Sequence, residues 1–307
     1  MTLRDATDAD LPTARAIAAL SFDLDPEDAA ELPRLLWSED PGTTRVRLVV
    51  EQRGAVRGVL LGSLQGADAF LDLVVVAPEA RNAGVARSLL AEWEARAAAA
   101  GATRSRVGEN LHTYAWPGVD IRYTGFLAML LRAGYTRTRT VYNMDLPLDH
   151  DVAPTRDALA RLEGAGLTVR RGGPADAEAV AEHTVRLWSD TSDVWFRETR
   201  TALHREPPPI FLALRGDRVV GFAVHGIHRP SLYGPIATDP AEQGHGIGAV
   251  LSALCLADMA GRGVRVAQIG WVAESAIPFY SRTAGARLGR CFWMLDKPLT
   301  AAERTAA

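Results

Sequence analysis

The chain has 307 residues, of which 48% are apolar and 23% charged, with a formal net charge of −3. This length favours two domains, each able to bury its own core, and the composition is typical of a soluble globular protein. The negative net charge argues against nucleic acid and against an anionic membrane as electrostatic partners.

Hydrophobic periodicity predicts a mixed α/β domain over residues 1–148. We expect strands near 2–4, 45–51, 55–63 and 69–76, a long helix over 82–100, a strand near 103–108, a helix over 120–133 and closing strands within 135–148. Residues 149–166, which contain a proline, a short helical stretch and two glycines, predict a linker.

The same order is predicted for a second domain over residues 167–300. We expect a strand near 167–171, helices over 174–189 and 193–205, strands at 210–214, 218–227 and 231–238, a helix over 244–262, a strand at 264–270, a helix at 275–284 and closing strands within 286–297. Strands and helices mixed in this way predict, in each domain, a central mixed sheet flanked by helices.

The two halves repeat each other. Their glycines and prolines coincide at one constant offset of 162 residues, which makes coincidence improbable. The matched positions are Pro78, Gly84, Ala86 and Gly101 in the first half and Pro240, Gly246, Gly248 and Gly263 in the second. We interpret the chain as a degenerate tandem duplication.

A short loop opens the long helix of each half. The loops read Arg81-Asn82-Ala83-Gly84-Val85-Ala86 and Gln243-Gly244-His245-Gly246-Ile247-Gly248, and both follow an apolar run and a proline. Backbone N–H groups at a helix start favour a phosphate, and glycine lets the backbone approach a bulky anion. A single such loop could equally be a tight strand-to-helix turn.

With these features the chain resembles the GNAT superfamily of acyl-CoA-dependent N-acyltransferases. The resemblance rests on the loop at 243–248, the helix behind it, and the Phe279-Tyr280 pair before Gly285, and it covers nearly the whole chain, once per half. It implies a splayed mixed sheet with acetyl-CoA between the strands at 231–238 and 264–270.

The resemblance also implies which residues bind acetyl-CoA. The backbone of Ile236, Ala237 and Thr238 would pair with the pantetheine arm, and the loop 243–248 would hold the pyrophosphate. In the first half the matching positions are Val74 and Val76 and the loop 81–86, where Ala86 stands for the last glycine.

The chemistry requires a neutral amine to attack a thioester and a thiolate to leave. A phenol is a competent proton donor to a leaving thiolate, so Tyr280, placed beside the thioester by the resemblance, is the candidate general acid; the alternative is that it only packs. A backbone N–H on the strand at 236–238 is the natural donor to the developing oxyanion.

The general base stays unassigned. Family members often carry a carboxylate on the strand leading to the loop, but in the second half that strand has none before Asp239. His225, His228, Asp239 and Glu274 remain possible. A further departure is Ala273, where many family members have an asparagine that contacts the cofactor.

The halves differ at the position of the acid. Counting back five residues from Gly134, the equivalent of Gly285, leads to Met129, whose thioether cannot donate a proton. The first half also has an insertion over 109–119 with His112, Tyr114 and Trp116. This insertion could supply a substitute acid, form a lid over the neighbouring site or be a packed loop at the domain interface. We therefore expect the C-terminal half to be catalytic and the N-terminal half to be degenerate or regulatory.

The leading hypothesis is an acetyl-CoA-dependent N-acetyltransferase acting on an amine of a small molecule or peptide. The alternatives are a non-catalytic acyl-CoA-binding or regulatory protein, and a mycothiol-synthase-like acetyltransferase. We expect a monomer or homodimer. Only two cysteines, Cys255 and Cys291, occur, which indicates no metal cluster and favours a reducing cytoplasm. No long apolar run or secretory signal is apparent, so we expect no membrane partner.

Overall fold

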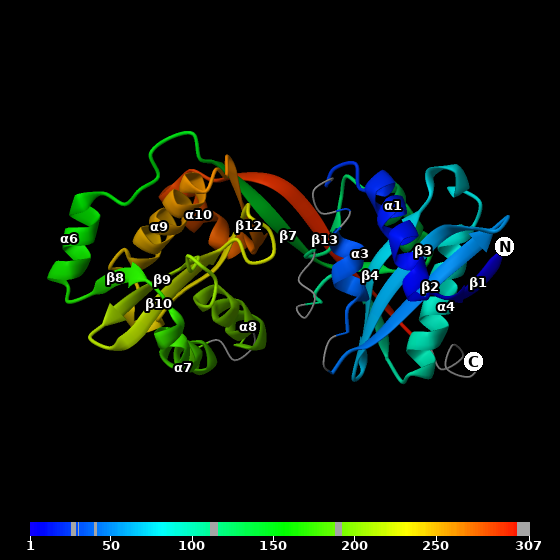
Figure 1. Ribbon diagram of the computed structural model, residues 1–307, viewed down its shortest axis with the longest axis horizontal. Helices are drawn as coiled ribbons and strands as arrows, with labels where there is room; N and C mark the ends of the chain where they lie inside the picture. The colour runs from blue at the N-terminus through cyan, green and yellow to red at the C-terminus, as the bar shows by residue number, and fades with distance from the viewer. Residues whose placement is uncertain (26–28, 30, 40–41, 111–115, 188–191, 300–307) are drawn as a thin grey trace. The chain divides into compact units, whose positions relative to one another are not determined.

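The structure is a computed structural model, and it describes residues 1–25, 29, 31–39, 42–110, 116–187 and 192–299. The chain forms two compact units (Figure 1). Unit 1 consists of Met1–Thr140 and Phe292–Ala307, and unit 2 of Val141–Cys291. Each unit is a mixed sheet covered by helices, as the sequence predicts.

The sheet of unit 1 has the strand order β1-β2-β3-β4-β5-β13. Its pairs are antiparallel except for the parallel pair β4–β5. The elements are β1 (Thr2–Asp5), α1 (Leu11–Ser21), α3 (Glu31–Trp37), β2 (Thr44–Gln52), β3 (Ala55–Gln65), β4 (Asp68–Val76), α4 (Val85–Ala99), β5 (Arg104–Val107), β6 (Val119–Asp120), α5 (Thr124–Arg132) and the start of β7 (Thr136–Pro147).

Unit 2 repeats this arrangement in the order β8-β9-β10-β11-β12-β7, again with one parallel pair, β11–β12. The elements are α6 (Arg156–Gly164), β8 (Thr168–Arg171), α7 (Ala177–Leu187), α8 (Ser192–Leu203), β9 (Ile210–Arg215), β10 (Arg218–His225), β11 (Leu232–Thr238), α9 (Ile247–Gly261), β12 (Val266–Val272), α10 (Ile277–Ala284) and β13 (Arg287–Pro298).

The last strand of each sequence repeat completes the sheet of the other unit. The C-terminal part of β7, from the first repeat, pairs with β12, with Ala267 opposite Leu146. The C-terminal part of β13, from the second repeat, pairs with β5, with Leu295 opposite Val107. In each repeat, the closing strands expected from the sequence therefore form a single long strand, β7 or β13. Each of these strands begins in one unit and ends in the other.

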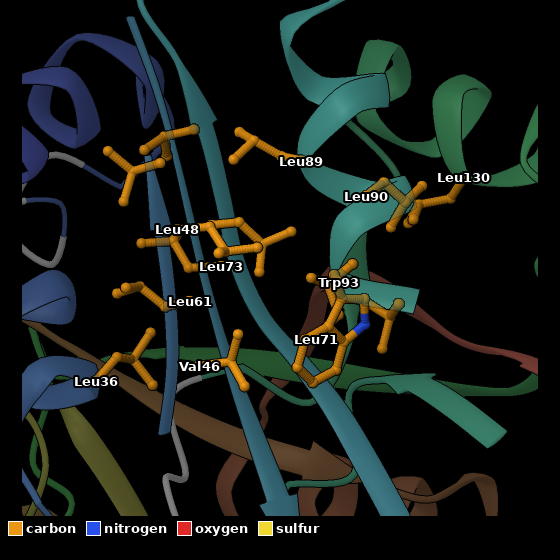
Figure 2. Packing of buried hydrophobic residues seen from close by; sticks show 14 of the residues in the cluster. Leu36, Val46, Leu48, Leu61, Leu71, Leu73, Leu89, Leu90, Trp93 and Leu130 are labelled. Atoms are coloured by element: carbon orange, nitrogen blue, oxygen red, sulfur yellow. The ribbon is translucent and has the colours of Figure 1, made fainter. Parts of the chain in front are cut away.

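The core of unit 1 lies between β2, β3 and β4 and their helices (Figure 2). Trp93 of α4 is fully buried, and its indole N–H donates to the Ser105 hydroxyl at 2.8 Å. Gly62 of β3 makes room for it, because a Cβ there would lie 2.3 Å from the Trp93 ring. Because Gly62 has no side chain, α4 can pack directly on β3 at this position.

In unit 2, alternate residues of β9 enter different cores, as expected for a strand buried on both faces. Phe211 and Ala213 pack on the α9 side of the sheet. Ile210 and Leu212 pack on the side of α7 and α8. In the described part of the chain, no helix has the length and apolar character needed to cross a membrane.

Candidate functional site

The parallel strands of unit 2 separate shortly after they meet. β11 and β12 pair at Leu232 with Gln268 and at Tyr233 with Ile269, whereas β11 continues to Thr238 paired with β10. Beyond Tyr233, the edge of β11 on the β12 side has no strand partner in the described part of the chain. Such an edge can accept an extended ligand through its backbone groups.

The positions expected to bind the pantetheine arm lie on this unpaired stretch. Ala237 is buried, and Ile236 and Thr238 are half-buried. Unit 1 has the same feature, because pairing between β4 and β5 stops at Phe70 while β4 runs on to Val76. Val74 and Val76, both half-buried, lie on that extension.

The loop of unit 2 has two left-handed residues. After a 3-10 turn over Pro240–Glu242, the chain passes Gly244 at φ 88° and Gly246 at φ 84°, and α9 begins at Ile247. No heavy atom lies within 4 Å of a Cβ built at either glycine, so the backbone conformation, rather than packing, requires glycine here.

This loop is suited to an anion. Among the described residues, the N–H groups of Gly244, His245 and Gly246 meet no backbone acceptor, and the first N–H groups of α9 have no intrahelical partner. Together with the positive end of the helix dipole, these groups favour a phosphate. The residues present therefore fit the pyrophosphate of CoA.

The loop of unit 1 follows the same backbone path. Asn82 has φ 62° and Gly84 has φ 82°, and α4 begins at Val85. Asparagine is among the few non-glycine residues that tolerate this conformation. Asn82 therefore stands where unit 2 has Gly244, and Arg81 and Ala83 fill the remaining loop positions.

Gly248 has a packing role besides the one predicted for it. A Cβ at this position would lie 3.2 Å from the ring of Phe279 on α10, so glycine brings α9 and α10 close together. In unit 1 the equivalent positions are Ala86, which is half-buried, and Ala128, which is exposed.

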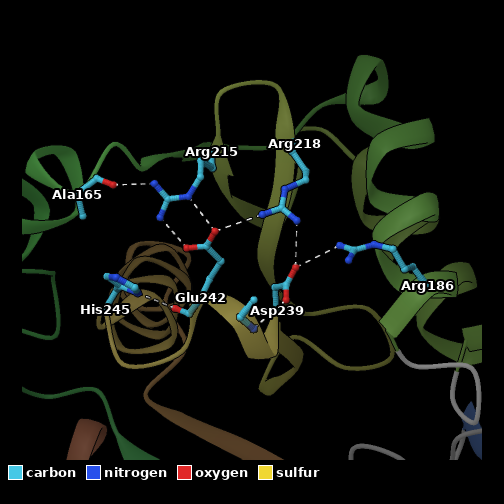
Figure 3. A network of polar contacts seen from close by, with 8 residues as sticks. Ala165, Arg186, Arg215, Arg218, Asp239, Glu242 and His245 are labelled. Carbon is cyan, nitrogen blue, oxygen red and sulfur yellow. Dashed lines mark hydrogen bonds and ion pairs between the residues drawn. The ribbon is translucent and has the colours of Figure 1, made fainter.

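A network of arginines and carboxylates lies behind the loop of unit 2 (Figure 3). Arg215 donates to both carboxylate oxygens of Glu242, at 2.8 and 2.6 Å, and Arg218 bridges Glu242 and Asp239. The hydrogen bond from Arg215 holds the pKa of Glu242 below its ordinary value. These bonds fix the turn over Pro240–Glu242 that precedes the left-handed glycines.

Asp239, a candidate base, belongs to this network. Its carboxylate accepts from the Ala241 N–H at 3.0 Å and from Arg186 at 3.2 Å. Burial alone would raise its pKa, but these donors and Arg218 bring the pKa below its ordinary value. Asp239 thus caps the turn as an ionised carboxylate.

The other candidate bases are also accounted for. His225 is buried, with Nε2 2.8 Å from Asp258, and burial lowers its pKa to about 4. His228 Nε2 lies 2.6 Å from the buried carboxylate of Glu198. Glu274 is exposed in the turn before α10. None of the four is marked out as a base by its environment, and the base stays unassigned.

Tyr280, the candidate acid, is half-buried on α10, which packs against α9. Its ring meets Tyr233 edge-on at 6.3 Å and Phe279 at 5.0 Å between centroids. Burial raises the pKa of the phenol to about 12, so it stays protonated at neutral pH. Within the described residues, its hydroxyl has no hydrogen-bond partner, whereas that of Tyr233 bonds Ser252 at 2.7 Å.

In unit 1, Met129 is half-buried against the core. His112 and Tyr114 of the insertion lie outside the described residues. Trp116 stacks on Phe292, with ring centroids 6.3 Å apart.

Two features escaped the sequence reasoning. Glu109 and Trp271, 162 residues apart, both have positive φ, at 63° and 57°; Glu109 follows β5, and Trp271 lies near the end of β12. The N–H of Trp271 donates to Asn143 at 3.2 Å. The second feature is a buried carboxylate, Asp72, within the apolar run of β4. A charged residue in an apolar strand, at a position where the second repeat has glycine, could have indicated it.

Comparison with known proteins places these features in a family. The sequence model of the acetyltransferase (GNAT) family matches residues 12–116 and 177–286, once in each repeat. A mycothiol acetyltransferase of Geodermatophilus obscurus is 30% identical over 232 residues, which are 70% of each chain. One of Catenulispora acidiphila is 29% identical over 207 residues, 62% of this chain and 60% of that protein.

Solved structures share the fold. A tandem GNAT protein from the clavulanic acid biosynthesis pathway has a TM-score of 0.73 at 19% identity, and the match covers 97% of this chain and 98% of that one. The glucosamine N-acetyltransferase region of a fungal multi-domain β-N-acetylglucosaminidase has a TM-score of 0.76 at 17% identity, covering 96% of this chain and 38% of that one.

Proposed function

The chain belongs to the acetyltransferase (GNAT) family, and on that premise we propose that it transfers an acetyl group from acetyl-CoA to a primary amine of a small molecule or peptide. Unit 2 is the proposed catalytic unit. The observation that carries this proposal is the pairing of the left-handed glycine loop of unit 2 with Tyr280 on the helix packed against α9, a pairing that the described residues of unit 1 do not repeat.

In this proposal, the backbone of Ile236, Ala237 and Thr238 binds the pantetheine arm, and the N–H groups of Gly244–Gly248 bind the pyrophosphate. Gln243, at the start of the loop, belongs to the same site. When bound, acetyl-CoA supplies an activated acyl thioester. Unit 1 has the same elements, with Arg81–Ala86 as its loop, and would hold a second CoA.

Tyr280 holds a proton at its hydroxyl and gives it to the departing sulfur. Because no other described group bonds this hydroxyl, it can point its proton at a ligand without breaking an existing hydrogen bond. The phenol is a weaker acid than an exposed tyrosine, but it is the protonated form that must be present, and its raised pKa ensures this at any pH below about 10.

The acceptor is proposed only as a class. Both curated relatives carry the name mycothiol acetyltransferase, so the acceptor amine of that reaction is the first to test. The chain spans 60–70% of their length. A non-catalytic acyl-CoA-binding protein is the alternative, and it is less consistent with a protonated, unbonded tyrosine at the catalytic position.

The test is steady-state release of CoA thiol by the full chain with a panel of primary amines. We expect amine-dependent release, and a fall in kcat of about 10²-fold or more in Tyr280→Phe, since removing a positioned acid typically costs 10²–10⁴-fold. Its Kd for acetyl-CoA should not change.

Tyr233→Phe is the matched control. It removes a buried hydroxyl that bonds Ser252, so it should lower stability by about 1 kcal/mol while kcat is retained. No release with any amine would refute an enzymatic role, and normal turnover by Tyr280→Phe would refute the acid.

A further inference from the structure

A cavity of about 460 Å³ opens on unit 1, between α1, the hairpin that joins β2 to β3, and the turn over Pro78–Ala80. This volume lies in the range of small-molecule sites. Ile17 and Leu20 of α1 line it with apolar surface, and Glu51 and Glu79 line it with carboxylates. The cavity therefore suits a small molecule that has both an apolar and a polar part.

The two units can be aligned residue by residue around this cavity. The backbone N–H of Ala77 bonds the carbonyl of Arg57, as that of Asp239 bonds the carbonyl of Val220. The helices α1 and α7 are both 11 residues long and begin 166 residues apart. Together with the pairs that close the two β-hairpins, these features assign Leu20, Ala55 and Ala77 of unit 1 to the positions of Arg186, Arg218 and Asp239 of unit 2.

In unit 2 these three positions belong to the network behind the loop (Figure 3). Arg186 lies 3.2 Å from the Asp239 carboxylate, and Arg218 bridges Asp239 and Glu242. In unit 1 a leucine and two alanines take these positions, and all three line the cavity. Unit 1 thus has a cavity where unit 2 supplies two guanidinium groups from its own chain.

Unit 1 nevertheless places carboxylates around this cavity. Glu51 accepts from Arg4 at 2.6 and 2.9 Å, both through Oε1, and Glu79 pairs with Arg57 through Oε1. Among the described residues, no group bonds Oε2 of either glutamate. With Asp10, the cavity is lined by three carboxylates and two arginines, so it has an excess of negative charge that favours a cation.

We propose that this cavity binds a small alkylguanidinium compound, with its guanidinium against Glu51 and Glu79 and its alkyl chain along α1. A guanidinium is planar and has five N–H donors, so a single group can bond two carboxylates at once. Bound there, it ties β2 to the turn before the loop, as Arg218 ties β10 to that turn in unit 2. The inference goes beyond the proposed function, because this ligand is neither the acetyl acceptor nor CoA.

The site is tested by NMR on the full chain without CoA, with ¹³C at the δ1 methyl groups of isoleucine. The chain has eight isoleucines, and Ile17→Val identifies the signal of the one that lines the cavity. n-Butylguanidinium chloride is the probe, and n-butylurea is its uncharged counterpart of similar shape. We expect the Ile17 signal to shift saturably with n-butylguanidinium but not with n-butylurea.

The role of the carboxylates is tested by Glu51→Gln combined with Glu79→Gln. This double variant should weaken the binding of n-butylguanidinium about tenfold, as expected from the loss of two partly exposed charge pairs. Glu92→Gln is the matched control, because Glu92 is a partly exposed glutamate of the same unit, pairs with Arg96 at 2.8 Å and lies outside the cavity. It should bind the probe as the wild type does.

Leu20→Arg combined with Ala77→Asp rebuilds in unit 1 the pair that Arg186 and Asp239 form in unit 2. The new pair should occupy the cavity, so the folded variant should no longer respond to the probe. An Ile17 signal that ignores n-butylguanidinium, or that moves equally with n-butylurea, overturns the inference. Wild-type affinity in either double variant overturns it as well.

The outcome is separable from that of the proposed function. A saturable shift at Ile17 without any acetyl transfer would leave the guanidinium site standing and remove the enzymatic proposal. Transfer that depends on Tyr280, with no response at Ile17, would do the reverse.

Discussion

Replacing Gly246 by alanine adds a single methyl group to the loop and tests whether this loop binds CoA. Gly246 has φ 84°, and a Cβ there meets nothing within 4 Å. The only cost is therefore that of a left-handed backbone, about 1–2 kcal/mol for an L-residue. The free loop can relax out of this conformation, but binding must restore it. The affinity for CoA should fall by about 5- to 30-fold, since 1.4 kcal/mol is a factor of ten.

Isothermal titration calorimetry of CoA into the full chain measures this loss. Gly261→Ala is the matched control, because Gly261 lies at the other end of the same helix, in open space and without positive φ. This control should leave the CoA affinity unchanged. Gly84→Ala should weaken only the site of unit 1, so the two loops can be told apart in the two-site isotherm.

Two results would refute the reasoning. A folded Gly246→Ala protein with wild-type affinity at both sites would show that the loop does not contact CoA. An equal loss in Gly261→Ala would show that the effect is not specific to the left-handed position. Circular dichroism of each variant excludes loss of folding as the cause.

Two further predictions concern stability. The pKa of His225 is about 4 in the folded chain against 6.5 in model peptides. Between these two pH values the unfolded chain binds more protons than the folded one, so protonation favours unfolding. The free energy of unfolding should therefore fall as the pH decreases from 6.5 to 4. His225→Gln should remove about 3 kcal/mol of that acid sensitivity in urea unfolding at pH 4 to 7; an unchanged pH slope would contradict it. Gly62→Ala places a Cβ 2.3 Å from the Trp93 ring and should cost about 1–3 kcal/mol in urea unfolding. Gly125→Ala, in open space in helix α5, should instead be neutral or slightly stabilising, and equal stability of both variants would disprove the packing argument.

The repeat and its loops were predictable because they depend on local chemistry. The long helices expected over 82–100 and 244–262 begin at Val85 and Ile247, directly after Gly84 and Gly246, which both have positive φ. The helix of Tyr280 runs over Ile277–Ala284, within the expected range of 275–284. Local periodicity and glycine positions carry such information in a single sequence.

The exchange of the last strands could not be predicted. β7 and β13 close equivalent sheets and carry similar alternating patterns. The alternation of each strand is therefore compatible with pairing in either sheet. Which one pairs with β5 is decided by tertiary contacts, such as the ion pair that Lys297 of β13 makes with Glu94 of α4 at 2.6 Å. A pairing between residues 203 positions apart leaves no local signature.

The buried Asp72 carboxylate was missed for a related reason. Its neighbours Arg45, Ser63 and Asn110 come from separate strands and a loop, and each alone reads as an ordinary polar residue. Only the sheet register brings them together. The strand expected over 69–76 contains Asp72, but its periodicity does not show which polar side chains of other strands face it.

The most direct test of the central claim is a crystal structure of the full chain with CoA. We predict CoA between β11 and β12 of unit 2, with its pyrophosphate on the N–H groups of Gly244–Gly248 and its sulfur within hydrogen-bond reach of the Tyr280 hydroxyl. CoA bound in unit 1 alone, or a sulfur remote from Tyr280, would contradict it.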